Sequence, residues 1–356
     1  MARAQKRYNV AVVGATGAVG TEMLRVLAER RFPVKGLRLL ASERSAGRRV
    51  PFNGSTHPIE RLQKRSFDGI DVALFSAGAS RSLEFGHEAV RRGAIVVDNS
   101  SAFRMDVTVP LVVPEVNPQA LRSHRGLIAN PNCSTIILLV PVAPLHHAVR
   151  LRRLVVATYQ SVSGAGAKAM AQLYEETKQV LRQFQVSRFK FQVRPKLETR
   201  NLRRETPLPA QIAFNLIPQV DVFLPDGSTK EEAKLVNETR KILGQRDLPV
   251  SAMCVRAPVF VAHSEAVWLQ TEQPLSVAQA RQLLRRAPGV RLVDEPGRGR
   301  YPMPVDAGAR DEVLVGRIRK DESVAHGLML WISGDNLRKG AATNAVQIAE
   351  LLIDGG

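Results

Sequence analysis

The chain has only two cysteines in 356 residues, Cys133 and Cys254, and they lie far apart. Two distant cysteines build no disulfide framework and match no metal-ligand spacing, so the sequence indicates neither a disulfide-rich secreted protein nor a zinc module. A reducing compartment is the natural inference. We therefore expect a cytoplasmic protein and no metal site.

Long apolar runs are also missing. The longest, Ile136 to Leu145, contains Pro141 and is too short to span a bilayer. The basic residues 1–7 lead into a short strand-like stretch, and no signal peptide follows. These absences argue against a membrane protein.

Acidic residues are scarce, because 33 Asp and Glu stand against 51 Lys and Arg, which gives a formal net charge of +18. Such an excess raises nucleic acid as a partner. However, arginine is spread along the whole chain, and no aromatic-studded basic helix is present. The densest basic stretch, residues 178–204, reads as a solvated surface excursion. We expect small anionic metabolites as partners, rather than nucleic acid or a membrane.

Strand-like and helix-like stretches alternate in the first third of the chain, which is long enough for about two domains. Such alternation predicts an α/β protein with a doubly wound parallel sheet of Rossmann type. The expected strands are 8–13, 37–41, 72–76, 95–98 and 126–129, with a helix at 82–92.

After Val149 the pattern changes to longer strands between helices, which indicates a second domain of α+β class. The expected strands are 154–161, 255–261 and 265–271, and the expected helices are 167–181, 230–243 and 276–286. A last helix at 341–353 is expected to return to the first domain.

A glycine-rich turn follows the first strand with the spacing G-x-x-G-x-x-G, from Gly14 to Gly20. The order strand, glycine turn, helix is the one a dinucleotide fold requires, because the backbone must approach a pyrophosphate at a helix N-terminus. The candidate cofactor contacts here are Gly14, Thr16, Gly17, Ala18 and Val19.

The second expected strand ends in a stretch that bears on the choice of nucleotide. Glu43 favours NAD, because an acidic residue here normally binds the ribose diol. Ser42, Arg44 and Ser45 favour NADP, because a guanidinium and two hydroxyl groups suit a 2′-phosphate. We expect NADP, with Glu43 turned outward.

Cys133 stands where a strand (126–129) and a turn (130–132) give way to a helix-like run. Backbone N–H groups and the helix dipole aimed at the sulfur are expected to lower its pKa, which would make it a nucleophile. The other interpretation is a small buried cysteine that fills a packing gap. Pro141 is expected to kink the following helix or to end it.

These features belong to a longer series of motifs, which includes 98–104, 130–135, 160–166, 213–218, 231–234, 256–259, 263–266 and 334–338. With this series, the chain resembles the bacterial aspartate-semialdehyde dehydrogenases nearly end to end. The resemblance implies a Rossmann NADP-binding domain, 1–131 plus 337–356, and a catalytic and dimerisation domain, 132–336.

The resemblance also implies an activity: NADP-dependent reductive dephosphorylation of L-aspartyl 4-phosphate to L-aspartate 4-semialdehyde. This oxidoreductase reaction belongs to amino-acid biosynthesis and feeds lysine (through diaminopimelate), threonine and methionine. Relatives act as homodimers or homotetramers. A thiolate displaces phosphate and leaves a thioester that accepts hydride, and Cys133 would be that nucleophile.

The resemblance assigns the remaining residues by motif. His263 would be the acid and base, and Gln160 would position the acyl group. Glu231 would bind the substrate ammonium and Arg256 its carboxylate. The other implied contacts are Asn132 for substrate, Arg104 and Lys234 for phosphate, and Ser163, Gly164 and Asn336 for the cofactor.

Spacing adds two expectations. Glu231 and Lys234 are three residues apart on a helix and therefore share a face. Arg256 and His263 are seven residues apart, so a flat strand would point them to opposite faces. A bend or bulge is required, and Pro258 can interrupt the ladder there.

Three alternatives stay open. N-acetyl-glutamyl-phosphate reductase shares the thioester chemistry, although Glu231 and Arg256 favour a free amino acid as substrate. A non-catalytic NADP-binding protein could keep the fold, although this chain retains both Cys133 and His263. A basic nucleic-acid binder would show steeply salt-dependent binding. The basic stretch Phe184 to Arg204 fits no firm family pattern.

Overall fold

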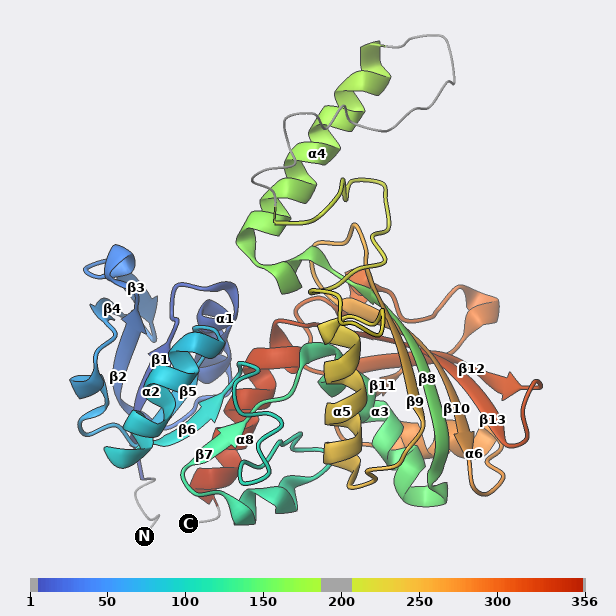
Figure 1. Ribbon diagram of the computed structural model, residues 1–356, viewed down its shortest axis with the longest axis horizontal. Helices are drawn as coiled ribbons and strands as arrows, with labels where there is room; N and C mark the ends of the chain where they lie inside the picture. The colour runs from blue at the N-terminus through green and yellow to red at the C-terminus, as the bar shows by residue number, and fades with distance from the viewer. Residues whose placement is uncertain (1–5, 187–206, 355–356) are drawn as a thin grey trace.

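The computed structural model describes residues 6–186 and 207–354, which form two sheets side by side (Figure 1). The first sheet has the strand order β3-β4-β2-β1-β5-β6-β7. Only β3 runs antiparallel to its neighbour. The strands are β1 Tyr8–Val13, β2 Val34–Ala41, β3 Arg49–Phe52, β4 Ser55–Arg61, β5 Val72–Phe75, β6 Ile95–Asp98 and β7 Leu127–Ala129. The predicted doubly wound parallel sheet is confirmed.

Helices cover both faces of the first sheet. Val10 and Val12 of β1 join the apolar cluster that contains residues of α1 (Ala18–Glu29) and α8 (Thr343–Asp354). Ala11 and Val13 join the cluster that contains residues of α2 (Ala79–Arg91). Alternate residues of one strand therefore face opposite layers, as the pleat requires. The expected return of the last helix to this sheet is confirmed.

The second sheet is mixed, with the strand order β11-β12-β13-β10-β8-β9. The pairs β8–β9 and β11–β12 are parallel and the other pairs are antiparallel. Its strands are β8 Leu151–Gln160, β9 Val250–Arg256, β10 His263–Thr271, β11 Val290–Leu292, β12 Val313–Asp321 and β13 Gly327–Gly334. The predicted second unit of mixed α and β structure is confirmed.

The second sheet is covered on one face by helices that contact its strands. These are α3 (Cys133–Val149), α5 (Lys230–Leu243) and α6 (Val277–Arg286). A short helix, α7 (Pro304–Ala307), contacts β13. The long helix α4 (Ala167–Val186) projects away from both sheets in Figure 1. It contains the start of the basic stretch 178–204, most of which lies outside the described residues.

One expected strand is wrong, and one of the two outcomes expected at Pro141 is excluded. The expected strand 255–261 does not exist, because β9 ends at Arg256 and the chain re-enters the sheet as β10 at His263. This connection contains Pro258 and supplies the expected bend between Arg256 and His263. Helix α3 does not end at Pro141 but continues to Val149. Its side chains are buried along most of its length, and such packing offsets the roughly 3 kcal/mol that an internal proline costs.

The chain passes between the two sheets at 130–132 and again at 335–342. The second passage includes a π-helical turn, η7 (Arg338–Ala342). Buried Arg338 pairs with Glu22 and Glu29 of α1 at 2.9 and 2.6 Å and with Asp311 at 2.9 Å. These ion pairs tie the segment after β13 to the first sheet.

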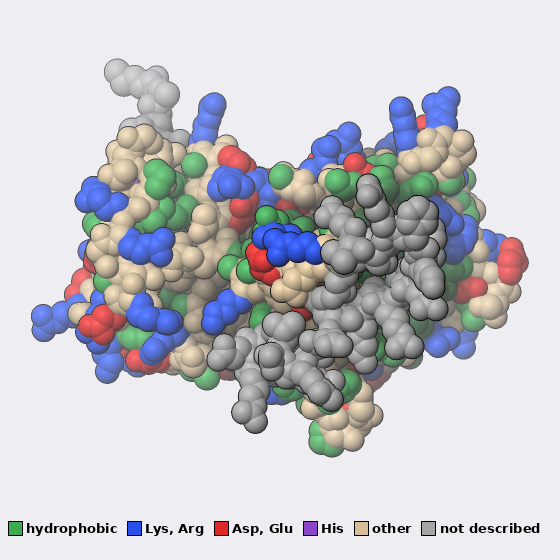
Figure 2. Space-filling view, turned by 90° about the horizontal axis from the view of Figure 1, so that it is seen from above, with side chains coloured by type: hydrophobic (Ala, Val, Ile, Leu, Met, Phe, Trp, Pro, Cys, Tyr) green, Lys and Arg blue, Asp and Glu red, His purple; other side chains and the backbone are tan. Residues whose placement is uncertain are grey.

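Lys and Arg side chains are dispersed over the face seen in Figure 2, with Asp and Glu among them. Among the described residues visible in that view, they do not gather in one patch. None of the helices within 6–186 and 207–354 has the length and apolarity needed to cross a bilayer.

Candidate active site

A cavity of about 660 Å³ is lined by residues of the first passage, of the loop after β6, of α5 and of the second sheet. All of the candidate catalytic, substrate and phosphate residues line it, and so does Gly164. These residues are Arg104, Asn132, Cys133, Gln160, Glu231, Lys234, Arg256 and His263. The fold therefore brings together residues that lie far apart in the sequence.

Cys133 is the first residue of α3, and Asn132 is its N-cap. The Asn132 Oδ1 accepts hydrogen bonds from the backbone N–H groups of Ser134 and Thr135, at 3.0 and 3.3 Å. Behind the sulfur lies Gly340 of η7, where an added Cβ would come within 3.0 Å of the Cys133 Cβ. The nucleophile position is therefore held by a cap on one side and close packing on the other.

The sequence predicts a lowered pKa for Cys133, and the structure shows the opposite. Burial, and then the negative charge of Glu231, raise the pKa of the thiol to about 12. Arg104, Arg256 and the Ser134 backbone N–H act in the other direction, but they do not outweigh the first two causes. The helix terminus alone does not make this cysteine a thiolate.

The Sγ of Cys133 lies 3.4 Å from Nε2 of His263. On the other side of the ring, Nδ1 accepts a hydrogen bond from the Ser161 backbone N–H at 3.0 Å. The neutral imidazole therefore carries its proton on Nε2, facing the sulfur. Burial, followed by the charge of Arg256, lowers the pKa of His263 well below its usual value.

Arg256 ends β9 and His263 begins β10, the two strands that flank β8 on opposite sides, and both side chains reach the cavity. The Nη1 of Arg256 donates to the Ser161 carbonyl at 2.8 Å, whereas its buried Nε has no partner among the described residues. Gly164 faces both side chains, because a Cβ there would lie 3.2 Å from Arg256 Nη1 and 3.4 Å from His263 Cε1. The glycine keeps the space between the cation and the imidazole open.

Glu231 is a buried carboxylate at the centre of the polar contacts. Its Oε1 accepts from the side-chain amides of Asn132 and Gln160 at 2.9 and 3.0 Å, and its Oε2 lies 3.2 Å from Lys234. Burial acts to raise its pKa, but Lys234 and the two amides outweigh burial and lower it. Glu231 is therefore an anion at neutral pH.

Lys234 also pairs with Asp221 at 2.7 Å. Burial acts to lower the pKa of this lysine, but Glu231 and Asp221 outweigh it and raise the pKa. The ammonium thus reaches the cavity as a cation shared by two carboxylates.

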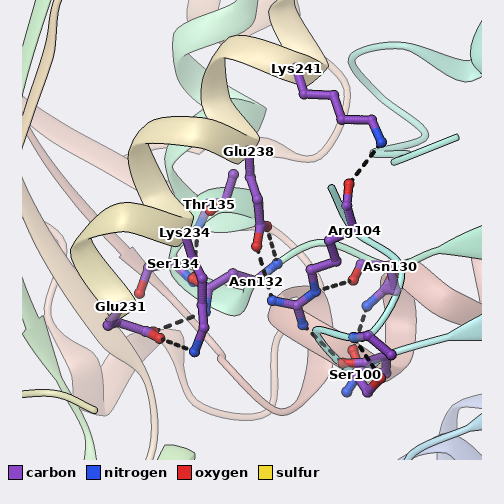
Figure 3. Close-up of polar contacts among 12 residues, drawn as sticks. Ser100, Arg104, Asn130, Asn132, Ser134, Thr135, Glu231, Lys234, Glu238 and Lys241 are labelled. Carbon is purple, nitrogen blue, oxygen red and sulfur yellow. Dashed lines mark hydrogen bonds and ion pairs between the residues drawn. The ribbon is translucent and has the colours of Figure 1, made fainter. Parts of the chain in front are cut away.

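Arg104 lies on the opposite side of Asn132 from Lys234 (Figure 3). Its Nε donates to the Asn130 carbonyl at 3.0 Å, its Nη2 to the Asn99 carbonyl at 2.9 Å, and its Nη1 to Glu238 at 3.1 Å. Three of its five N–H groups are engaged in these contacts, which leaves two N–H groups for a ligand.

The structure adds residues that the sequence interpretation misses, namely Ser161, Asp221, Glu238, Lys241 and Gly340. The available signal for Glu238 and Lys241 is helical spacing, since they continue the face of α5 that begins with Glu231 and Lys234. Asp221 and Gly340 have no local signal, because their partners lie in distant segments.

The glycine turn between β1 and α1 fits a dinucleotide. A Cβ on Gly14 would lie 2.3 Å from the Ser76 carbonyl oxygen, and one on Gly20 would lie 2.2 Å from the Gly14 carbonyl oxygen. Gly17 is the N-cap of α1 and offers no capping side chain, so the first N–H groups of the helix are left for a phosphate. Thr16, Ala18 and Val19 lie at this turn.

The loop after β2 contains Ser42 and the short helix Glu43–Ser45. Glu43 pairs with Arg61 at 3.2 Å on the protein surface. Asn336 and Ser163 do not line the cavity; they are buried and bonded to each other, with Asn336 Nδ2 2.9 Å from Ser163 Oγ. Asn336 Oδ1 also accepts from Ser161 Oγ at 3.0 Å.

Comparison with known proteins gives the class first. Residues 9–124 match the NAD binding domain of semialdehyde dehydrogenases, and residues 142–339 match their dimerisation domain. A Rossmann sheet, a second mixed sheet and a cysteine–histidine cavity between them therefore define an NAD(P)-binding oxidoreductase.

The chain belongs to the aspartate-semialdehyde dehydrogenase family. It is 50% identical to the Aquifex aeolicus enzyme of that name over 352 residues, which are 98% of this chain and 99% of the relative. It is 48% identical to the Bacillus subtilis enzyme over 345 residues, 97% of each chain. The crystal structure of aspartate semialdehyde dehydrogenase II complexed with ASA from Vibrio cholerae superposes with a TM-score of 0.90 at 45% identity, covering 98% of this chain and 99% of that one.

Proposed function

We propose that this enzyme catalyses the reversible, NADP-dependent reductive dephosphorylation of L-aspartyl 4-phosphate to L-aspartate 4-semialdehyde. The observation that carries the proposal is the 3.4 Å approach of Cys133 Sγ to His263 Nε2 in a cavity that is also lined by three cations and two carboxylates. The product is the aldehyde from which lysine, threonine and methionine are made.

The charges of the cavity match the substrate group by group. Glu231 pairs with the α-ammonium, and Arg256 pairs with the α-carboxylate through the edge that contains its unpartnered Nε. Arg104 and Lys234 bind the phosphate, which competes with Asp221 and Glu231 for the lysine. Asn132 and Gln160 hold Glu231 in place through their amides.

Cys133 carries the covalent step. Its thiolate attacks the acyl carbon, the carbon–oxygen bond to phosphate breaks, and the phosphate leaves with the electron pair. NADPH supplies the hydride that reduces the resulting thioester. His263 gives the proton that it took from the thiol to the substrate oxygen as the hydride is transferred. It takes this proton back when the carbon–sulfur bond of the thiohemiacetal breaks, the electron pair of that bond stays on the Cys133 sulfur, and the aldehyde forms.

Proton transfer from the thiol requires a change on the histidine ring. To accept the thiol proton at Nε2, His263 must carry its other proton on Nδ1, where Ser161 Oγ lies 3.0 Å away. Ser161 Oγ donates to Asn336 Oδ1 at 3.0 Å, so its lone pairs are available to that Nδ1 proton. Binding of the substrate ammonium to Glu231 also weakens one of the two causes that raise the Cys133 pKa.

NADP is the proposed cofactor, bound at Gly14, Thr16, Gly17, Ala18 and Val19 and, near the cavity, at Ser163, Gly164 and Asn336. Ser42, Arg44 and Ser45 would take its 2′-phosphate. The ion pair of Glu43 with Arg61 supports this preference, because it engages the carboxylate that would otherwise bind a ribose diol. A higher kcat/KM with NADP than with NAD is expected, and equal values would contradict the preference.

We further propose the boundaries 1–131 plus 337–356 for the cofactor domain and 132–336 for the catalytic domain, and a homodimer formed through the second domain. The face of the second sheet away from the helices supports the dimer. Met253 of β9 is exposed on it, and Tyr301 and Met303 line a pocket there with Trp268 of β10 and Trp331 of β13.

The decisive experiment is phosphate-dependent reduction of NADP with aspartate semialdehyde, run on the wild type and on Cys133→Ser. The wild type should turn over only when phosphate is present, and Cys133→Ser should lose turnover but keep its affinity for NADP. Activity only with N-acetyl-glutamate semialdehyde would establish the reductase alternative. Unchanged turnover in Cys133→Ser would refute the thioester.

A further inference from the structure

Four charged residues of alternating sign occupy one face of α5, and this face is turned towards Asn132 and Arg104 (Figure 3). They are Glu231, Lys234, Glu238 and Lys241, whose spacing places them on successive turns of one face. We infer that Glu238 is a positioning residue for phosphate binding. Its carboxylate fixes Arg104, the proposed phosphate ligand, relative to Cys133. The inference rests on the proposed function, in which Arg104 binds phosphate.

The two oxygens of Glu238 contact two different segments. Oε1 lies 3.1 Å from Nη1 of Arg104, and Oε2 accepts a hydrogen bond of 2.6 Å from the backbone N–H of Asn132. Glu238 is only 1% exposed, so its carboxylate is enclosed by protein and its position is fixed by its neighbours. One rigid group therefore spans from the guanidinium to the residue directly before the nucleophile.

Lys241 supports the same arrangement from the next turn of α5. Its ammonium donates to the carbonyl oxygens of Arg104, Asp106 and Val109 at 2.8, 2.7 and 2.9 Å. Glu238 thus holds the side chain of Arg104, and Lys241 holds its backbone. A guanidinium held in this way is oriented before phosphate arrives, as a preorganised anion site requires.

The sign of the Glu238 charge separates positioning from simple electrostatics. A carboxylate beside Arg104 repels phosphate, so a residue acting only through its charge would weaken phosphate binding. The enzyme with the neutral Glu238→Gln substitution would then bind phosphate more tightly. If Glu238 acts by position, the Glu238→Gln variant binds phosphate more weakly, because one of the two contacts then falls on an amide NH2 group, which cannot accept from Arg104 or Asn132.

The test compares Glu238→Gln with Glu232→Gln in phosphate-dependent NADP reduction with aspartate semialdehyde. Glu232 is a matched control on the same helix, since it is also buried but accepts from the Thr229 and Cys254 N–H groups, away from Arg104. Glu238→Gln should raise the KM for phosphate at least tenfold, with the KM values for aldehyde and NADP within twofold of the wild type. Glu232→Gln should leave the KM for phosphate within twofold. An unchanged or lowered KM for phosphate in Glu238→Gln overturns the inference.

A second measurement does not depend on turnover. Inorganic phosphate should slow the alkylation of Cys133 by iodoacetamide, as measured by mass spectrometry of the Cys133 peptide. The Glu238→Gln variant should need at least ten times more phosphate than the wild type for half-maximal protection. Equal protection in the two proteins overturns the inference, as does absence of protection in the wild type. If the wild type is protected but does not use aspartate semialdehyde, the proposed substrate fails while Glu238 is still tested. Should Glu238→Gln not fold, Lys241→Met carries the same expectation, because it frees the Arg104 backbone.

Discussion

Cys133 is held as a thiol by its surroundings in the free enzyme. Burial and Glu231 raise its pKa to about 12, and burial with Arg256 lowers the pKa of His263, so neither group of the pair favours its charged form. The rate of alkylation by iodoacetamide should therefore rise about tenfold per pH unit from pH 6 to pH 9. A plateau below pH 8 would instead indicate a thiolate–imidazolium pair in the free enzyme.

Ser161 decides which nitrogen of His263 carries the proton. Its backbone N–H favours an unprotonated Nδ1, whereas its hydroxyl is the acceptor that a protonated Nδ1 needs. Ser161→Ala keeps the first contact and removes the second, so we expect kcat to fall about tenfold or more, with the KM for aldehyde unchanged. The acid limb of the pH profile of kcat should move to lower pH, because the imidazolium loses an acceptor and the pKa of His263 falls further. An unchanged kcat and profile would assign Ser161 to packing alone.

At the scale of elements, the π-helical turn η7 fixes the position of Cys133 in the cavity. Gly340 brings its backbone against Cys133, and an alanine there would place its Cβ 3.0 Å from the Cys133 Cβ. Gly340→Ala should displace α3 at its first turn and lower kcat/KM by about tenfold or more, since small misplacements at a reacting centre are costly. Gly297→Ala is the control, because a Cβ at that position meets no atom within 4 Å. Equal losses in the two variants would exclude a specific effect at Cys133.

Strand β10 contains a buried carboxyl that no described contact satisfies. Glu265 is fully buried, both of its carboxyl oxygens lack a partner among the described residues, and burial raises its pKa well above 4.5. Above about pH 4.5 the unfolded chain loses a proton that the folded protein keeps, so this group costs stability as pH rises towards its folded pKa.

Glu265→Gln removes that cost. The variant should unfold at the same urea concentration as the wild type at pH 4 and at a higher one at pH 8, with a gain of about 1 kcal/mol or more in the free energy of unfolding. A variant that is less stable at pH 8 would show that the carboxyl has a stabilising contact in solution.

The elements also show how far the sequence predicts the site. Helix α5 and its Glu231–Lys234 pair are local features, because the capping box of Thr229 and Glu232 marks the helix start. Strand β1 and its glycine turn are local in the same sense. Glu238 is different, because its partners Arg104 and Asn132 lie on other segments of the chain. The continuation of α3 through Pro141 likewise depends on tertiary packing, which local propensity does not contain.

Electrostatics is the other limit of sequence-based prediction. A cysteine at a helix N-terminus predicts a lowered pKa, yet at Cys133 burial and Glu231 decide the direction. Glu231 approaches the sulfur only because α5 packs on α3. The residue types of the site were therefore predictable, whereas the balance of charges among them required the fold.

At the scale of the whole molecule, the proposed dimer would form through the open face of the second sheet. Met253 on β9 is 54% exposed there. Met253→Arg should shift the enzyme from dimer to monomer in light scattering, because a charge in an apolar interface is costly to desolvate. Val107→Arg is the control, since Val107 is 93% exposed in the loop between β6 and β7. A dimeric Met253→Arg variant would place the interface elsewhere.

The position of α8 has a consequence for how the protein is made. Its apolar residues complete one core of the first sheet, beside β1 and α1. During synthesis β1 to β7 emerge early, whereas α8 is at the far end of the chain. At about 5–20 residues per second, the ribosome needs on the order of ten seconds or more to add the chain between Ala129 and Thr343. The first sheet is therefore synthesised first, but its core is completed last. Until α8 is added, one face of the sheet exposes apolar side chains, and a chaperone would bind the nascent chain there.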